Sequence, residues 1–235
     1  MQRSIVERLR ELLQLFFPET CEVCGNSLRY GEHLLCTDCL LDIPQIYLHN
    51  KERNPVEKMF AGQVQFERAT AFFNYQKHTN YAHLIHKLKY QGRDDIGILL
   101  GEMFGVKLQE SGFLDDIDAI VPIPLHPKRQ RKRGYNQSQK IAEGISNITK
   151  TPIITDAVIR KIYTNTQTRK NKEERAENVQ GIFEVSNPSL LTDKHILILD
   201  DVITTGATCI SCAETILQNS NVRFVSFASV ALANT

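Results

Sequence analysis

The sequence predicts an α/β protein in which a parallel sheet is flanked by helices and preceded by a small cysteine-rich module. Two observations carry this prediction. Segments of strand character and of helical periodicity take turns along most of the chain, and that order is typical of a parallel sheet covered by helices. Near the N-terminus four cysteines crowd into one short segment, and a polar stretch separates them from the alternating part.

Length and composition agree with this division. A chain of 235 residues suits one sizeable domain with a small appendage. Hydrophobic residues make up 42% and charged residues 23% of it, the ordinary balance of a protein with a buried core. The formal net charge of +1 does not indicate any class of binding partner. A nucleic-acid interaction must therefore rest on local clusters of charge. The polar stretch 49–55 predicts the boundary, with an N-terminal helix and four-cysteine module at 1–50 and the α/β domain at 51–235.

Residues 1–17 are apolar at helical spacing, but charged residues interrupt them, which predicts an amphipathic helix rather than a signal peptide. Its polar face is not predominantly basic, and this favours docking on the body of the protein over a membrane surface. No apolar stretch reaches the roughly 18 residues that span a bilayer, so no transmembrane helix is expected. The clustering of the cysteines favours a reducing cytoplasm over a secreted disulfide framework.

The elements of the α/β domain follow from hydrophobic periodicity. In chain order they are a strand at 69–75, helices at 81–90 and 96–108, a strand leading into a loop at 118–124, a helix at 137–148, strands at 157–162 and 196–199, a helix at 209–217 and a strand at 222–231. The four consecutive apolar residues at 196–199 are typical of a strand buried on both faces, as central parallel strands are.

An acid pair, Asp200 and Asp201, follows that buried strand. Ligands of open α/β sheets bind at this end of the strands, and adjacent carboxylates there can accept hydrogen bonds from two vicinal hydroxyls of a sugar. The next residues enter a helix, and their backbone N–H groups and hydroxyls form a cradle for a phosphate; they are Thr204, Thr205, Gly206, Ala207 and Thr208. The alternative is a tight turn with capping threonines and solvated aspartates, but the complete strand, loop and helix pattern favours the cradle.

A strongly basic segment follows the predicted strand at 118–124. Five of the six residues at 128–133 are cationic, namely Lys128, Arg129, Arg131, Lys132 and Arg133. A loop of this charge after a parallel strand can neutralise a pyrophosphate or contact a nucleic-acid backbone. The third interpretation is a basic face that only meets solvent.

The four N-terminal cysteines form two C-x-x-C pairs separated by eleven residues, Cys21 with Cys24 and Cys36 with Cys39. Gly25 suits the tight turn after the second sulfur. This spacing predicts a closed four-thiolate site for a structural zinc ion, and His33 is expected to be only a nearby polar residue. Cys209 and Cys212 repeat the spacing on a predicted helix, where small buried core residues are the preferred interpretation.

The strand, acid pair and loop at 196–208 resemble the signature with which type I phosphoribosyltransferases bind phosphoribosyl pyrophosphate (PRPP). The resemblance implies that Asp200 and Asp201 hold the ribose hydroxyls, that the loop from Thr204 to Thr208 holds the 5-phosphate, and that magnesium accompanies PRPP. Enzymes that salvage 6-oxopurines generally carry an aspartate where Thr204 stands, which argues against hypoxanthine or guanine as the acceptor. A flexible loop that closes over the reacting centre is implied at Arg160, Gln167, Arg175 and Asn178, although their polar composition equally suits an idle surface loop.

Taken together, the motifs resemble the ComF family. They occur in the order of the four-cysteine segment, His86-Lys-Leu-Lys-Tyr-Gln-Gly92, Val121-Pro-Ile-Pro-Leu-His126, Arg133-Gly-Tyr-Asn-Gln137, Arg175 with Asn178, and the 196–208 signature. The resemblance covers the chain from about Pro18 to its end. It implies an association with natural competence, the uptake and handling of transforming DNA, and a phosphoribosyltransferase-like fold. Lys89 and Arg133 are the candidates for phosphate or pyrophosphate contact, with ordinary surface cations as the alternative.

Two functions are compatible with these motifs. The first is a magnesium-assisted glycosyl transfer, in which pyrophosphate leaves the anomeric carbon of the ribose and a nitrogen nucleophile of unknown identity attacks. Its catalytic residues are not identified, and because the sequence stops soon after the last predicted strand, an acceptor pocket is expected from residues 55–81. The second is a PRPP-sensing module whose cysteine module and basic loop engage single-stranded DNA or DNA-uptake proteins, since a shared fold does not settle the reaction.

Overall fold

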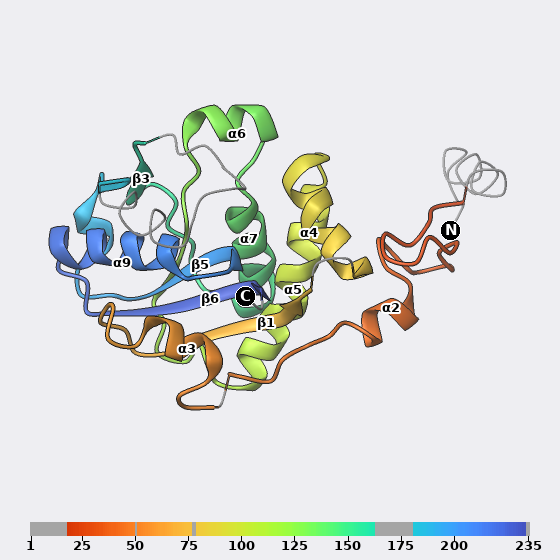
Figure 1. Ribbon diagram of the computed structural model, residues 1–235, viewed down its shortest axis with the longest axis horizontal. Helices are drawn as coiled ribbons and strands as arrows, with labels where there is room; N and C mark the ends of the chain where they lie inside the picture. Colours follow the sequence, from red (N-terminus) through yellow and green to blue (C-terminus); the bar gives the residue numbers. More distant parts are fainter. Residues whose placement is uncertain (1–17, 50, 77–78, 163–180, 234–235) are drawn as a thin grey trace, which may run out of the picture.

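The centre of the protein is a parallel sheet (Figure 1). The computed structural model describes residues 18–49, 51–76, 79–162 and 181–233. Within them four strands form the sheet in the order β1, β6, β5, β2, and every pairing is parallel. The bounds are Ala69–Tyr75 for β1, Ala119–Pro122 for β2, His195–Ile203 for β5 and Phe224–Ala233 for β6. The predicted fold class, a parallel sheet flanked by helices, is confirmed.

Helices cover both faces of the sheet. The described helices are α2 (Thr37–Leu41), α3 (Pro55–Phe60), α4 (Asn80–Tyr90), α5 (Asp94–Glu110), α6 (Pro127–Arg133), α7 (Gln137–Thr149) and α9 (Ala207–Asn219), with a 3-10 turn η1 at Pro188–Leu190. One buried cluster joins α4, α5 and α7 to the sheet, and a second joins α3 and α9 to it. The sheet therefore forms the middle of three layers.

Strand β5 connects the two buried clusters. Side chains alternate across a strand, so Leu197 and Leu199 pack in the cluster of α4, α5 and α7, while Ile196 and Ile198 pack in the cluster of α3 and α9. All four are fully buried. The continuous apolar run at 196–199 thus has the two buried faces that its sequence predicts.

The strand expected at 157–162 lies outside the main sheet. It is reduced to β3 (Val158–Arg160), which pairs antiparallel with β4 (Phe183–Val185). Val158 is buried against the α9 side of the core, but Ile159 is 43% exposed. Because only one face of this short strand is covered, it does not meet the requirement of a central parallel strand, and the chain before it touches β2 through an isolated bridge from Ile153 to Ile120.

The basic segment expected to be a loop is helix α6. His126 caps its N-terminus by accepting a hydrogen bond from the Lys128 N–H, and Pro127 occupies the first helical position. Gly134 ends the helix in the left-handed conformation at φ 87°. A proline at the start and a glycine just past the end are helix signals. These two residues therefore predict the helix, although the high charge of the segment favours a loop.

The polar stretch at 49–55 ends in a packed structure rather than a free linker. Asn54 is 4% exposed and forms a capping box with Glu57 at the start of α3. Its side-chain amide also donates to the carbonyl of Ala69 in β1, at 2.8 Å. The division at residue 50 stays a prediction, and the amphipathic helix predicted at 1–17 lies outside the described residues.

None of the helices among the described residues has the length and apolar character needed to cross a bilayer.

Glycines bring α5 and α7 into close contact. A Cβ on Gly144 would lie 2.1 Å from the carbonyl oxygen of Ile98, and one on Gly101 would lie 2.2 Å from that of Ile141. Both distances are far below van der Waals contact, so the two helices meet backbone to backbone. Helix α7 carries residues of the site described below, and this contact fixes its position.

We predict that Gly144→Ala lowers the free energy of unfolding by about 3 kcal/mol, because the added methyl group must separate two packed backbones. Urea denaturation of the parent and the variant measures this difference. Ser146→Ala on the same helix is the control and should change the value by less than about 1 kcal/mol. Equal stability of Gly144→Ala and the parent would show that the two helices are free to separate.

Candidate functional site

The acid pair lies at the carboxyl edge of the sheet. Strand β5 continues to Ile203, so Asp200 and Asp201 lie inside it rather than after it. Strand β2 stops where Pro122 pairs with Leu199, and Asp200 is therefore the first residue of β5 beyond the end of its neighbour. The extra length of β5 opens a step in the sheet edge, and the two carboxylates occupy it.

Two helices supply partners to the acid pair. From α4, the Lys89 ammonium lies 3.0 Å from Oδ1 of Asp201. From α7, the Ser138 hydroxyl donates to Oδ1 of Asp200 at 3.2 Å, and the same oxygen accepts from the backbone N–H of Asp201 at 2.8 Å. Asp201 is only 8% exposed. The carboxylates are thus held by a cation and by neutral donors, with oxygens left to accept further hydrogen bonds.

Burial and the adjacent charge of Asp201 raise the pKa of Asp200 to about 6, while Lys89 and the hydrogen bonds from the Asp201 N–H and Ser138 oppose that rise. The pKa of Lys89 is itself raised, because the attraction of Asp201 and Asp200 outweighs the effect of burial, which alone would lower it. Lys89 is therefore a permanent cation at the acid pair.

The loop after β5 forms a small pocket. Asp200 and the residues 202–209 line it, and it occupies about 200 Å³ with its open mouth. Gly206 has a φ of 75°, and a Cβ there would lie 2.9 Å from the ring of Phe60, so two constraints select glycine. Helix α9 begins at Ala207, and its N-cap residue Gly206 has no side chain that could cap it, while the Thr205 hydroxyl accepts a long hydrogen bond from the Ala207 N–H at 3.5 Å. The N–H groups of a first helical turn need partners from outside the helix, and an anion suits them.

A second pocket opens at the end of β2 and occupies about 490 Å³ with its open mouth. Its lining is mostly polar and comprises Pro122, Pro124, Leu125, Gln130, Asn136, Gln139 and Thr155. Asn136 fixes one wall: its side chain donates to the carbonyl of Ile123 and caps α7 by accepting from the Ser138 N–H. Because β2 and β5 are adjacent, the two pockets open at neighbouring strand ends with the acid pair beside them.

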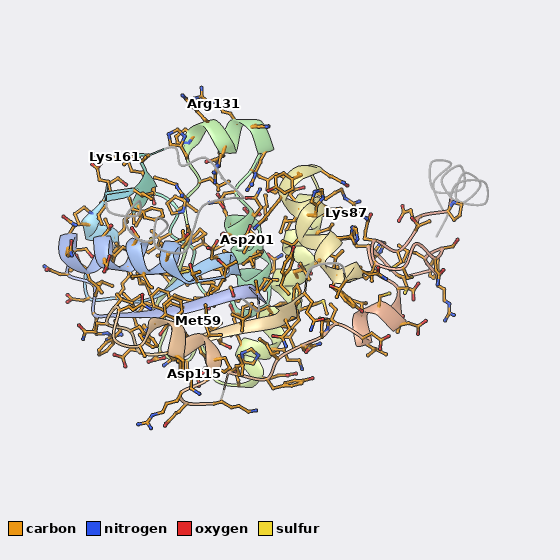
Figure 2. All side chains as sticks on the ribbon, viewed as in Figure 1. Met59, Lys87, Asp115, Arg131, Lys161 and Asp201 are labelled. Carbon is orange, nitrogen blue, oxygen red and sulfur yellow. The ribbon has the colours of Figure 1, made fainter. Side chains whose placement is uncertain are left out.

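The predicted cations separate into three groups. Lys89 reaches the acid pair, as described. Arg133 donates to Oε1 of Gln137 at 2.7 Å and lies over the ring of Tyr90, with 5.3 Å between guanidinium and ring centre, so it joins the ends of α4 and α7. Lys128, Arg129 and Arg131 lie on α6, and Figure 2 places Arg131 at the outer side of that helix.

From β3, Arg160 approaches the site. Burial and the charge of Arg129 lower its pKa, against the attraction of Asp200, and its guanidinium lies 5.4 Å from the centre of the Phe183 ring. The other predicted loop residues, Gln167, Arg175 and Asn178, lie outside the described residues. The closing loop therefore stays a prediction, with Arg160 as its anchored end.

Sequence reasoning missed the serine on α7. Ser138 contacts Asp200, but a serine in the first turn of an amphipathic helix carries no signal of its own. The cap before it does carry one, because asparagine before an apolar helical pattern marks a helix N-terminus, and Asn136 caps α7. That signal predicts where α7 begins, at the carboxyl edge of the sheet. It does not predict the contact between Ser138 and Asp200.

The four N-terminal cysteines gather into one cluster. Their sulfur atoms all lie within 4.8 Å of one another, and those of Cys24 and Cys36 are 3.8 Å apart. A tetrahedral zinc ion with Zn–S bonds of about 2.3 Å places its sulfurs about 3.8 Å apart, so the cluster fits a structural metal. His33 is not part of it. Cys209 and Cys212 are buried core residues, as predicted.

The thiols of the cluster differ in acidity. Despite burial, hydrogen bonds from the backbone N–H groups of Cys24, Cys36 and Val23 lower the pKa of Cys21 to about 6. Burial and the neighbouring sulfurs raise the pKa of Cys39 above its ordinary value. One thiolate thus forms readily, and a bound cation is needed to ionise the whole set.

The fold and site together define a class: a parallel α/β protein with an acid pair at the carboxyl edge of its sheet, a glycine-capped helix N-terminus beside it, and a separate four-cysteine cluster.

Three proteins that are similar in sequence narrow this class further. It is 27% identical over 202 residues to the DNA utilization protein YhgH of Escherichia coli K12, covering 85% of this chain and 84% of that protein. It is 28% identical over 193 residues to competence protein F of Haemophilus influenzae, covering 80% and 74%. Competence protein ComFC of Bacillus subtilis is 33% identical over 107 residues, 46% of this chain and 41% of that protein. The resemblance to the ComF family is thereby confirmed, although no family model matches the chain.

Solved structures overlap with part of the chain at low scores. The glutamine PRPP amidotransferase of Bacillus subtilis has a TM-score of 0.40 and 18% identity, over 61% of this chain and 30% of that one. A hypoxanthine phosphoribosyltransferase of Staphylococcus aureus has a TM-score of 0.37 and 14% identity, over 59% and 62%. Overlap at these scores carries no argument, and the fold class rests on the sheet topology itself.

We predict that Asp200→Asn stabilises the protein at pH 8 and has less effect at pH 5. The pKa of Asp200 is about 6 in the folded chain and about 3.9 in an unfolded one, so ionisation costs the folded state stability as the pH rises from about 4 through 6. Removing the charge should therefore add about 3 kcal/mol at pH 8 and about half of that at pH 5.

Urea denaturation at both pH values measures this effect, and Glu214→Gln, an exposed carboxylate on α9, is the control. A stabilisation that is equal at pH 5 and pH 8 would contradict the assignment of the raised pKa to Asp200.

Proposed function

We propose that the chain binds PRPP along the carboxyl edge of its sheet, with the ribose hydroxyls on Asp200 and Asp201 and the 5-phosphate in the loop 204–208. The observation that carries this proposal is the position of the acid pair beside the pocket at the N-terminus of α9, where the N-cap residue is a glycine. Carboxylate oxygens accept from sugar hydroxyls, and first-turn N–H groups donate to a phosphate. The order of these groups along the edge matches the order of ribose and 5-phosphate in PRPP.

The pyrophosphate of PRPP has its place at the other side of the acid pair. The pocket at the end of β2 lies there, and Lys89 of α4 and Arg133, the last residue of α6, bring positive charge to the same side. Magnesium, which prefers oxygen ligands and substrate phosphates, would accompany PRPP and neutralise the pyrophosphate. The cations of α6 add to the positive field over this pocket.

Phosphoribosyl transfer is the reaction that such a site serves. The bond between the anomeric carbon and the pyrophosphate oxygen breaks, and its electron pair leaves with pyrophosphate. A nitrogen of the acceptor forms the new bond to that carbon and gives up a proton. Negative charge grows on the pyrophosphate, where Lys89 and Arg133 stabilise it, and positive charge grows on the sugar, next to the carboxylates. The acceptor is of unknown identity, and Thr204 argues against a 6-oxopurine.

The names of the relatives indicate the biological process that this chemistry would serve. Because the relatives are DNA utilization and competence proteins, we place the PRPP site in the handling of DNA during natural competence. The four-cysteine cluster holds a structural zinc ion in this proposal, since a site with four thiolates leaves no position for water.

Calorimetric titration with magnesium and PRPP tests the proposal. The parent should bind, and the double variant Asp200→Asn, Asp201→Asn should bind about a hundredfold more weakly or worse, because hydrogen bonds to charged groups contribute about 1.5 to 3 kcal/mol each. Glu214→Gln is the control and should bind as the parent does. Failure of the parent to bind PRPP would remove the proposed function.

The second candidate is a non-catalytic PRPP sensor that binds single-stranded DNA. Helix α6 favours it, because five of its seven residues are cationic and the helix buries none of them. A short exposed helix of one charge sign suits the phosphate backbone of a nucleic acid. Pyrophosphate release across a panel of bases separates the two candidates: release with any base supports the transferase, and none alongside salt-sensitive DNA binding supports the sensor.

We predict that Lys128→Glu, Arg131→Glu weakens binding to a single-stranded oligonucleotide by about tenfold and lowers the salt dependence, since each phosphate contact contributes about 0.7 to the slope. Fluorescence anisotropy at several salt concentrations measures both quantities. Lys51→Glu, Lys58→Glu, which reverses two exposed charges in and before α3, is the control. Unchanged affinity in the α6 variant would show that this helix does not contact DNA.

A further inference from the structure

The four-cysteine module is attached to the rest of the protein through Glu22. This residue lies inside the first C-x-x-C pair, and its side chain is 15% exposed. Its Oε2 lies 2.5 Å from the ammonium of Lys87, at the end of α4, and its Oε1 pairs with the guanidinium of Arg93 at the start of α5. Lys87 also donates to the Glu22 backbone carbonyl at 3.2 Å. One carboxylate of the module thus joins the ends of two helices.

Helix α4 connects this attachment to the acid pair. An α-helix turns about 100° per residue, so the side chains of Lys87 and Lys89 leave its last turn on nearly opposite sides. Lys87 reaches Glu22 in the module, and Lys89 reaches Asp201 in the sheet. The last turn of α4 therefore lies between an acidic group of the module and an acidic group of the site.

Other contacts hold the same helix. The Tyr81 hydroxyl, in the first turn of α4, donates to the carbonyl of Cys39 at 2.8 Å. The Tyr135 hydroxyl donates to the carbonyl of Leu88 at 2.6 Å, and Leu88 is fully buried in the cluster that also contains Cys36 and Cys39. Ion pairs in such a partly buried and packed setting are less screened than exposed ones, so they fix the position of α4.

We propose that Glu22 is a positioning residue for the PRPP site. A metal ion bound by the four thiolates fixes the first C-x-x-C pair, which contains Glu22. Glu22 in turn fixes the last turn of α4, and α4 presents Lys89 to Asp201. The inference rests on the proposed function and deepens it, because it makes the metal module a support of the phosphosugar site. Coupling between two sites is reciprocal, so PRPP must in turn stabilise the bound metal.

The test compares the zinc-loaded parent with Glu22→Gln, which keeps all four thiols and removes the charge, and with Asp38→Asn, an exposed acidic residue of the same module, as the control. Glu22→Gln should bind magnesium and PRPP about tenfold more weakly, a factor typical of coupling between sites. Saturating PRPP should slow zinc transfer to a colorimetric chelator about tenfold in the parent and in Asp38→Asn, and should not slow it in Glu22→Gln. A purely structural role of Glu22 would leave this slowing in place.

Unchanged PRPP affinity and unchanged slowing in Glu22→Gln would overturn the inference. Hydrogen exchange of the zinc-loaded proteins, without PRPP, decides it independently of the proposed function. Glu22→Gln should exchange faster than the parent at 86–90 and at 199–203, and equal exchange would also overturn the inference. If the parent binds no PRPP, the proposed function fails, and this exchange measurement still determines whether Glu22 holds α4 against the acid pair.

Discussion

The ion pair between Lys89 and Asp201 is the interaction on which the site depends. Two adjacent carboxylates in a partly buried strand repel each other, and this repulsion together with burial raises the pKa of Asp200 to about 6. A cation at 3.0 Å from Asp201 offsets part of that cost. The acid pair therefore depends on α4, which holds Lys89 in place, and α4 is itself held by the cysteine module and by Tyr135, just before α7.

The sequence predicted the fold well where a pattern has a single physical meaning. The apolar run at 196–199 requires two covered faces, and the structure covers both. Two C-x-x-C pairs predict one cluster, and the four sulfurs gather. Where a pattern has several meanings, prediction failed. The charge of the segment 128–133 favours a loop, although the proline and glycine around it mark a helix, and the periodicity at 157–162 predicts a strand of the main sheet, which β3 does not join.

The site was predictable in its strand and loop but not in its tertiary partners. Asp200 and Asp201 come directly after the apolar run at 196–199 within β5, so their place at the edge comes from local sequence. Ser138 and Glu22 contact Asp200 and Lys87 across large separations in the chain, and no local pattern marks either residue. The sequence marks Lys89 only through its motif. Its direction toward Asp201 depends on the packing of α4, because nothing in the sequence of a helix states which side meets the sheet.

A crystal structure with PRPP and magnesium bound tests the central claim most directly. The account predicts ribose hydroxyls within hydrogen-bond distance of Asp200 and Asp201, the 5-phosphate at the N-terminus of α9, and the pyrophosphate in the pocket at the end of β2 near Lys89. PRPP bound elsewhere on the protein, or bound with both carboxylates still free of contact to the ribose, would contradict it.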